Sequence, residues 1–211
     1  MINRSRWWIG SGIAGVAGTA CYILATAVVS WPDTQLGLTT ALLMASAWPI
    51  LSIIYSYGLY GFVAAERDSP ANALAMIFAV AAFSMVLAMI VVQLAVDAGT
   101  TEIAKGVDPA AMASLKRGLR LIDMGLDVAW DVLIGMALIC SGVALRRHSG
   151  FGPWWAFPSI AFGAALIALN AMTFPWPPAS RGLFDIGPAI GLFVMALAAR
   201  LALLGRRAAH P

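Results

Sequence analysis

Charged residues are scarce in this chain. Lysine, arginine, aspartate and glutamate make up 11% of the 211 residues, against about 25% in soluble proteins, while hydrophobic residues make up 61%. A water-soluble surface consists mainly of charged and polar side chains, which 13 basic and 10 acidic residues are too few to provide. The mean hydropathy of +0.86 points the same way. The composition therefore excludes a soluble domain, a disordered chain, collagen and a coiled coil, and it predicts that the lipid bilayer is the solvent.

Cysteine and histidine are equally scarce, and their shortage excludes several kinds of site. Cys21 and Cys140 lie inside apolar runs with no CxxC spacing and no neighbouring histidine, so no zinc or iron–sulfur ligand set is visible. His148 and His210 both lie near predicted helix ends, which argues against a haem held by two histidines. No phosphate-binding glycine loop, nucleophile elbow or HExxH motif is present. We expect no cofactor, and the sequence does not define a metal ligand.

Long apolar runs are abundant. Six of them reach the length of about 20 residues that an α-helix needs to cross about 30 Å of hydrocarbon. Segments rich in proline, glycine or charge separate the runs, for example Glu66–Pro70 and Arg146–Gly150. The predicted spans cover about 7–30, 38–65, 71–96, 109–145, 154–174 and 183–204. Because backbone groups in hydrocarbon must be paired internally, we predict an all-α, polytopic transmembrane helical bundle that forms a single integral membrane domain over residues 1–211.

The first run has some features of a cleavable signal peptide, because Arg4 and Arg6 precede it and Ala25-Thr26-Ala27 lies near its end. It is longer than the usual apolar core of about 7–15 residues, however, and further crossings follow it. We therefore expect an uncleaved first helix.

The fourth predicted helix is unusually long. Asp108-Pro109 is a good start, with an N-cap residue followed by proline at the first helical position. Nothing stops the helix from there to Leu145, so it would measure roughly 55 Å at 1.5 Å per residue. We predict that this helix extends outside the membrane, after a long connection from the end of the third helix near Val96.

The distribution of lysine and arginine predicts the orientation. With both termini in the cytoplasm, the inner side carries Arg4, Arg6, Arg67, Arg146, Arg147, Arg200, Arg206 and Arg207, and the outer side carries Lys105, Lys116, Arg117, Arg120 and Arg181. The inner group is larger, as the positive-inside rule requires. We predict a multi-pass protein of the bacterial cytoplasmic (inner) membrane with both termini cytoplasmic. The net charge of +3 is explained by this distribution, and no nucleic acid partner is expected.

Three aspartates recur at every fourth position in the run LIDMGLDVAWDVLI, residues 121–134. Side chains four apart share one face of a helix, so Asp123, Asp127 and Asp131 lie on one face at increasing depth. An ionised aspartate at mid-membrane costs about 2.5–3.5 kcal/mol on insertion scales. Protonation, a cationic partner, a bound cation or a polar cavity must offset that cost.

Other polar residues are expected at the same level of the bundle. These are Gln93 and Asp97 on the third predicted helix, Asn170 on the fifth, and Arg181 and Asp185 near the sixth. Together with the aspartates they predict an outward-facing acidic pocket that binds a cation, a proton or a small polar ligand, for transport or sensing. Arg181 and Asp185 would form a gate at its mouth. The predicted ligand-binding residues are Gln93, Asp123, Asp127, Trp130, Asp131, Asn170, Arg181 and Asp185.

The same residues have alternative interpretations. Polar side chains in membrane bundles often only join helices, and a protonated Asp131 bonded to Asn170 or Trp130 would be satisfied without a ligand. The chain would then be a non-catalytic accessory or structural subunit of a larger membrane complex, or a homo-oligomer, with a closed pocket. An enzyme is the third hypothesis, because two carboxylates can do acid–base work. No nucleophile or metal set supports it, and no catalytic residue is predicted.

Small residues predict close helix contacts. Ser11, Gly15 and Gly18, and the pair Gly187 and Gly191, have the spacing that lets helix backbones approach. We expect packing within the chain rather than a dimer contact.

The C-terminal half resembles a known group of proteins. The segments that carry the resemblance are Gly125–Asp131 (GLDVAWD), Thr173–Pro178 (TFPWPP) and Gly182–Pro188 (GLFDIGP). They resemble a family of uncharacterised bacterial multi-pass membrane proteins with six helices, over about Leu121–Leu204. The resemblance implies a polytopic helical protein of the cell membrane, and it implies no reaction and no functional residue.

Overall fold

The computed structural model of the chain describes residues 4–28, 35–103 and 106–209, and for residues 26–28, 35, 36, 38 and 97–103 it describes the backbone alone. The elements are α1 (Arg4–Val28), α2 (Gln35–Glu66), α3 (Pro70–Ile103), α4 (Pro109–Leu145), α5 (Pro153–Thr173), the 3-10 helix η2 (Pro178–Arg181) and α6 (Gly187–Ala209). All six α-helices are long and apolar enough to cross a membrane. The predicted all-α fold with six membrane-spanning helices is confirmed, and the chain is a multi-pass membrane protein in contact with the lipid bilayer.

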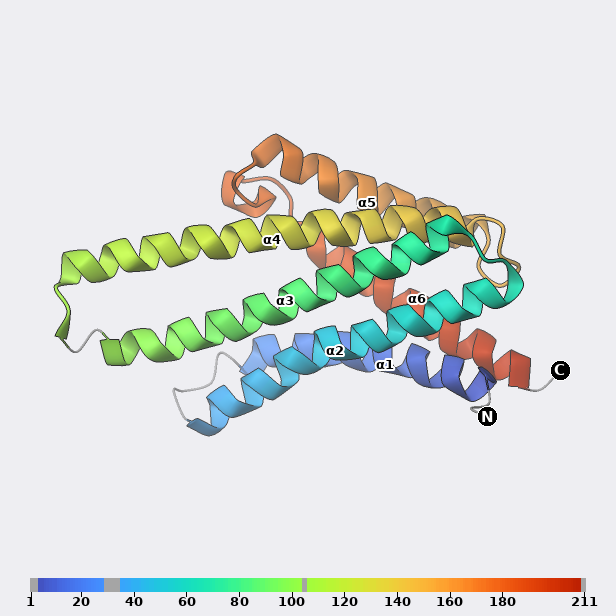
Figure 1. Cartoon of the computed structure of the whole chain (residues 1–211), viewed down its shortest axis with the longest axis horizontal. Helices are drawn as coiled ribbons and strands as arrows, with labels where there is room; N and C mark the ends of the chain where they lie inside the picture. The colour runs from blue at the N-terminus through green and yellow to red at the C-terminus, as the bar shows by residue number, and fades with distance from the viewer. Residues whose placement is uncertain (1–3, 29–34, 104–105, 210–211) are drawn as a thin grey trace.

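The helices form a bundle whose neighbours mostly follow the chain order. α1 packs against α2 and α6, α2 against α3, and α4 against α3 and α5. The first turn of α1 and the last turn of α6 lie at one end of the bundle, which we call the terminal end (Figure 1). The loops between α2 and α3 and between α4 and α5 lie there too. The opposite end, called the distal end, holds the α5–α6 connection and the paired outer parts of α3 and α4.

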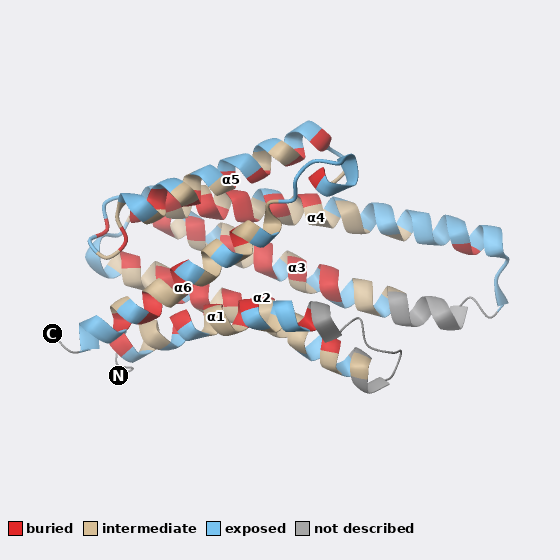
Figure 2. Cartoon of the chain, turned by 180° about the vertical axis from the view of Figure 1, so that it is seen from behind, coloured by how far each residue is buried: buried red, intermediate tan, exposed pale blue. Residues whose placement is uncertain are grey.

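The long fourth helix is present as predicted. Asp108 caps it, because its Oδ2 accepts a hydrogen bond from the Ala111 backbone N–H at 3.0 Å, and Pro109 occupies the first turn. Figure 2 shows that the outer part of α4 is largely exposed. The third membrane span, Pro70–Val96, agrees with the predicted 71–96, but the helix α3 itself continues to Ile103, so the expected long connection to α4 is short.

The boundaries of the sixth helix also differ from the prediction. It begins at Gly187 rather than Leu183, and it runs to Ala209 rather than Leu204. The late start has a local cause, because η2 ends at Arg181 and the next residue, Gly182, has a left-handed φ of 74° that turns the chain. Asp185 then caps the helix, its Oδ1 accepting from the Gly187 backbone N–H at 2.8 Å. The predicted end of the first helix at Ser30 and the break at Trp31–Asp33 lie outside the described residues.

Close helix contacts at small residues are confirmed for part of the predicted set. A Cβ atom on Gly58 of α2 would overlap the Ser11 side chain of α1, and one on Gly15 would meet Ala198 of α6 at 2.7 Å. Gly18 similarly faces α2. Gly191 instead has nothing within 4 Å of such a Cβ, so it leaves open space rather than a contact.

The outer surface is apolar, as lipid contact requires. Leu43 is 67% exposed, Phe157 61% and Ile122 60%. These side chains belong to three different helices, so the apolar surface is not one confined patch.

Candidate functional site

A cavity of about 460 Å³ lies between the helices near the α5–α6 connection, and it opens to the surface at exposed lining residues such as Phe184 and Leu192. Its wall combines residues of all six helices with the α5–α6 connection. Three carboxylates face it, those of Asp127 and Asp131 on α4 and of Asp185 before α6, and we call it the acidic cavity. Most of the rest of its wall is apolar, with Leu166 and Ile190 as examples. Its volume falls within the range of about 300–1,000 Å³ typical of small-molecule sites.

The carboxylates of the acidic cavity come from two different elements of the chain. Asp127 and Asp131 lie one turn apart on α4, so the predicted shared helix face is confirmed at these two positions. Asp185 belongs to the α5–α6 connection, and its carboxylate is held in place because Oδ1 accepts a hydrogen bond from the Gly187 backbone N–H.

Asp131 is joined to α5 by a buried hydrogen bond. The Asn170 side-chain amide donates to Asp131 Oδ2 at 2.9 Å and also to the Leu166 carbonyl at 3.0 Å. Asn170 is 1% exposed and Asp131 is 7% exposed. Asn170 Oδ1 is buried and finds no hydrogen-bond partner among the residues that the structure describes. The predicted association of these two residues is therefore observed.

Aromatic rings from four helices form one side of the acidic cavity. Tyr22 of α1 lies 4.2 Å from Trp48 of α2, measured between ring centroids. Trp48 in turn lies 6.0 Å from Trp130 of α4 and 6.2 Å from Phe83 of α3. We call these four residues the aromatic wall. The indole N–H of Trp130 is buried without an acceptor in the described part of the chain. The sequence had not indicated that Trp48 would join this site.

Gln93 and Asp123 pair with each other rather than with the acidic cavity. The Gln93 amide donates to Asp123 Oδ1 at 2.6 Å, linking α3 to α4. Both residues line a neighbouring hollow of about 700 Å³ whose wall also includes Lys116 and Arg120. The ring of Tyr22 borders both spaces. The side chain of Asp97, predicted at the same level, lies outside the described residues.

Arg181 lies on η2 and not in the wall of the acidic cavity. Its guanidinium stacks on the Trp176 ring, 5.4 Å from the centroid. Asp185 is engaged with the start of α6 instead. Within the described residues, no ion pair joins Arg181 to Asp185, the two residues predicted to form a gate.

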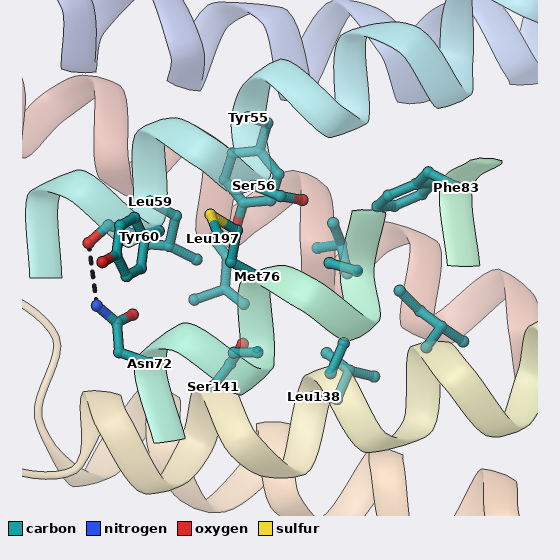
Figure 3. Close-up of a pocket in the computed structure, with 15 residues that line it drawn as sticks. Tyr55, Ser56, Leu59, Tyr60, Asn72, Met76, Phe83, Leu138, Ser141 and Leu197 are labelled. Atoms are coloured by element: carbon teal, nitrogen blue, oxygen red, sulfur yellow. Dashed lines mark hydrogen bonds between the residues drawn. The ribbon is translucent and has the colours of Figure 1, made fainter. Parts of the chain in front are cut away.

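A third cavity, of about 50 Å³, lies between α2, α3, α4 and α6 (Figure 3). Asn72 borders it and donates to the Tyr60 carbonyl at 3.0 Å, and Ser56 and Ser141 also face it. This space has room for only a few water molecules. It is too small for an organic ligand.

A polar cluster at the terminal end was missed by the sequence analysis. His148 is buried, and its Nδ1 accepts a hydrogen bond from the Gly150 N–H at 3.0 Å, so the neutral ring carries its proton on Nε2. Nε2 lies 3.5 Å from Glu66 Oε2, and Arg200 donates to the Gly150 carbonyl at 2.8 Å. Burial lowers the pKa of His148, and the nearby Glu66 carboxylate opposes that change only in part. A histidine in a short polar loop gives no signal that distinguishes this buried position.

The described residues contain no group of three or more histidine, cysteine, aspartate or glutamate side chains able to hold a metal ion. The acidic cavity therefore offers carboxylates and aromatic rings rather than a metal-binding cage. The chain matches no protein-family model, no curated protein and no solved structure.

Proposed function

We propose that this protein is an integral membrane protein whose acidic cavity binds a cationic ligand, in transport or sensing. The observation that carries the proposal is the exposure of three carboxylates to one cavity of about 460 Å³. Concentrated negative charge within a largely apolar bundle is costly, and a bound cation removes that cost. The buried bond from Asn170 holds Asp131 in position while leaving its carboxylate on the cavity wall.

We also propose that the acidic cavity faces the outside of a bacterial inner membrane. The start of α1 and the end of α6 share the terminal end, where the arginines of the larger predicted group also gather (Figure 1). The positive-inside rule then assigns the terminal end to the cytoplasm and the distal end to the exterior. Labelling with an impermeant maleimide tests this orientation. In a cysteine-free background, S114C on outer α4 should react from outside intact cells, whereas R207C should react only after lysis.

The accessory-subunit hypothesis is less well supported. It predicted a closed, dry bundle around the aspartates, whereas Asp131 lines a cavity large enough for a small molecule. Its buried bond to Asn170 fits either hypothesis, and the unfilled volume favours a ligand site.

Ligand-dependent stabilisation tests the proposed function. The free energy of unfolding of the full-length protein in nanodiscs is measured with sodium, potassium, magnesium and choline salts, between pH 5 and 8. A ligand at 100 times its Kd stabilises the folded state by about 2.7 kcal/mol. At least one cation should stabilise the wild type in this way, and Asp131→Asn and Asp127→Asn should reduce the effect.

Asp68→Asn is the control, because Asp68 carries the same charge in an exposed loop at the terminal end. It should respond to the cation as the wild type does. The proposal is wrong if no cation or proton stabilises the wild type, or if Asp131→Asn is stabilised equally.

A further inference from the structure

We infer that the ligand of the acidic cavity is an organic ammonium cation with an apolar body, an inference that rests on the proposed function. The aromatic wall, the size of the cavity and the apolar remainder of its lining carry this inference. Each of them distinguishes an organic cation from a proton or an inorganic ion.

The aromatic wall faces the same space as the carboxylates. Tyr22, Phe83, Trp48 and Trp130 all line the acidic cavity, together with Asp127 and Asp131. The faces of aromatic rings carry negative electrostatic potential, and they attract a cation that has shed its water. Quaternary and other substituted ammonium groups shed water readily, so they gain most from rings combined with carboxylates. A magnesium ion instead requires an octahedral shell of oxygen ligands.

The volume of the acidic cavity argues in the same direction. About 460 Å³ is far more than one ion with its first waters needs, given about 30 Å³ for each water. The remaining wall includes Leu166, Ile190 and Leu192, which offer no hydrogen bonds. An apolar body attached to the ammonium group would bury against these side chains and displace water that is poorly held there.

Calorimetry on the full-length protein in nanodiscs tests the inference. The probes are benzyltrimethylammonium, sodium chloride, and neopentylbenzene, in which carbon replaces the charged nitrogen. We expect benzyltrimethylammonium to bind and the two other probes to bind at least about tenfold more weakly. Asp131→Asn and Trp48→Leu should each weaken its binding by about tenfold. Trp48→Phe, which retains an aromatic face, should bind within about threefold of the wild type. Asp68→Asn should bind as the wild type does.

The outcomes separate this inference from the proposed function. Binding of sodium or protons that depends on Asp131, without binding of benzyltrimethylammonium, overturns the organic ligand and preserves a cation site. Equal binding of neopentylbenzene overturns it too, because the cavity would then be a general apolar site. If Asp131→Asn loses affinity for benzyltrimethylammonium and Trp48→Leu does not, the aromatic wall takes no part in binding, and that part of the inference is wrong. Binding of none of the probes overturns the organic ligand, and it overturns the cation site as well only if no cation or proton stabilises the wild type in the unfolding experiment.

Discussion

Replacing Asn170 with leucine should destabilise the protein through Asp131. The change removes the amide that donates to the carboxylate at 2.9 Å, and it keeps a side chain of similar size. A buried polar group left without its partner costs about 1–3 kcal/mol. Because Asp131 is only 7% exposed, we expect Asn170→Leu to lower the free energy of unfolding by about 2 kcal/mol.

A double-mutant cycle isolates the contribution of the pair. Replacing both polar partners with apolar groups of similar shape is nearly neutral, so Asp131→Leu combined with Asn170→Leu should cost less than the sum of the single changes. We expect a coupling energy of about 1–2 kcal/mol, near the upper limit measured between membrane helices. Unfolding of the full-length protein in mixed micelles, followed by tryptophan fluorescence, provides the measurement.

The matched control uses Asp123, which lies on the same helix and bonds to Gln93 instead. Asp123→Leu combined with Asn170→Leu should be additive within about 0.5 kcal/mol, as expected for residues without a shared partner. A coupling energy below about 0.5 kcal/mol for Asp131 and Asn170 would refute the reasoning, because it would mean that the buried bond contributes nothing to stability.

Two further predictions concern packing and the terminal end. Gly58→Ala should lower the free energy of unfolding by about 1–3 kcal/mol, because the new methyl group overlaps Ser11, whereas Gly61→Ala should not, since Gly61 faces open space. Ser11→Gly should rescue part of the loss, and equal melting temperatures for the two alanine variants would contradict the contact. His148 should remain neutral in the folded protein, since burial lowers its pKa from about 6.5 and its Nδ1 accepts from Gly150. The contribution of neutral His148 to the free energy of unfolding is therefore complete above about pH 6.5, and it is lost as the pH falls below that value. The melting temperature of the wild type should fall more steeply than that of His148→Gln between about pH 6.5 and 5, and parallel curves would contradict this assignment.

The sequence predicted those features that depend on local pattern. The six apolar runs specify the helices, because backbone groups in hydrocarbon leave few alternatives. Asp108 and Pro109 specify the start of α4 through a cap that the structure confirms. The spacing of four residues placed Asp127 and Asp131 on one face, and this face lines a cavity.

The remaining features depend on contacts between distant residues. The predicted level of Asn170 in the bundle was enough to place it near Asp131, and the two are hydrogen-bonded. The sequence did not show that Asp123 would bond to Gln93 and line a different space. Trp48 follows an apolar stretch and precedes Pro49, a pattern that gives no sign of an aromatic wall. The burial of His148 depends on how the α4–α5 loop folds back against α2. Such positions are fixed by tertiary packing, which local periodicity does not encode.

Asp185 connects the occupancy of the acidic cavity to the folding of one helix turn. The same carboxylate faces the cavity and caps the N–H of Gly187, so neither role is independent of the other. A cation held by Asp185 would alter how firmly α6 begins, and thermodynamic reciprocity requires that loosening this turn alter the affinity by the same factor. Amide hydrogen exchange at the start of α6 would then serve as an internal reporter of ligand binding.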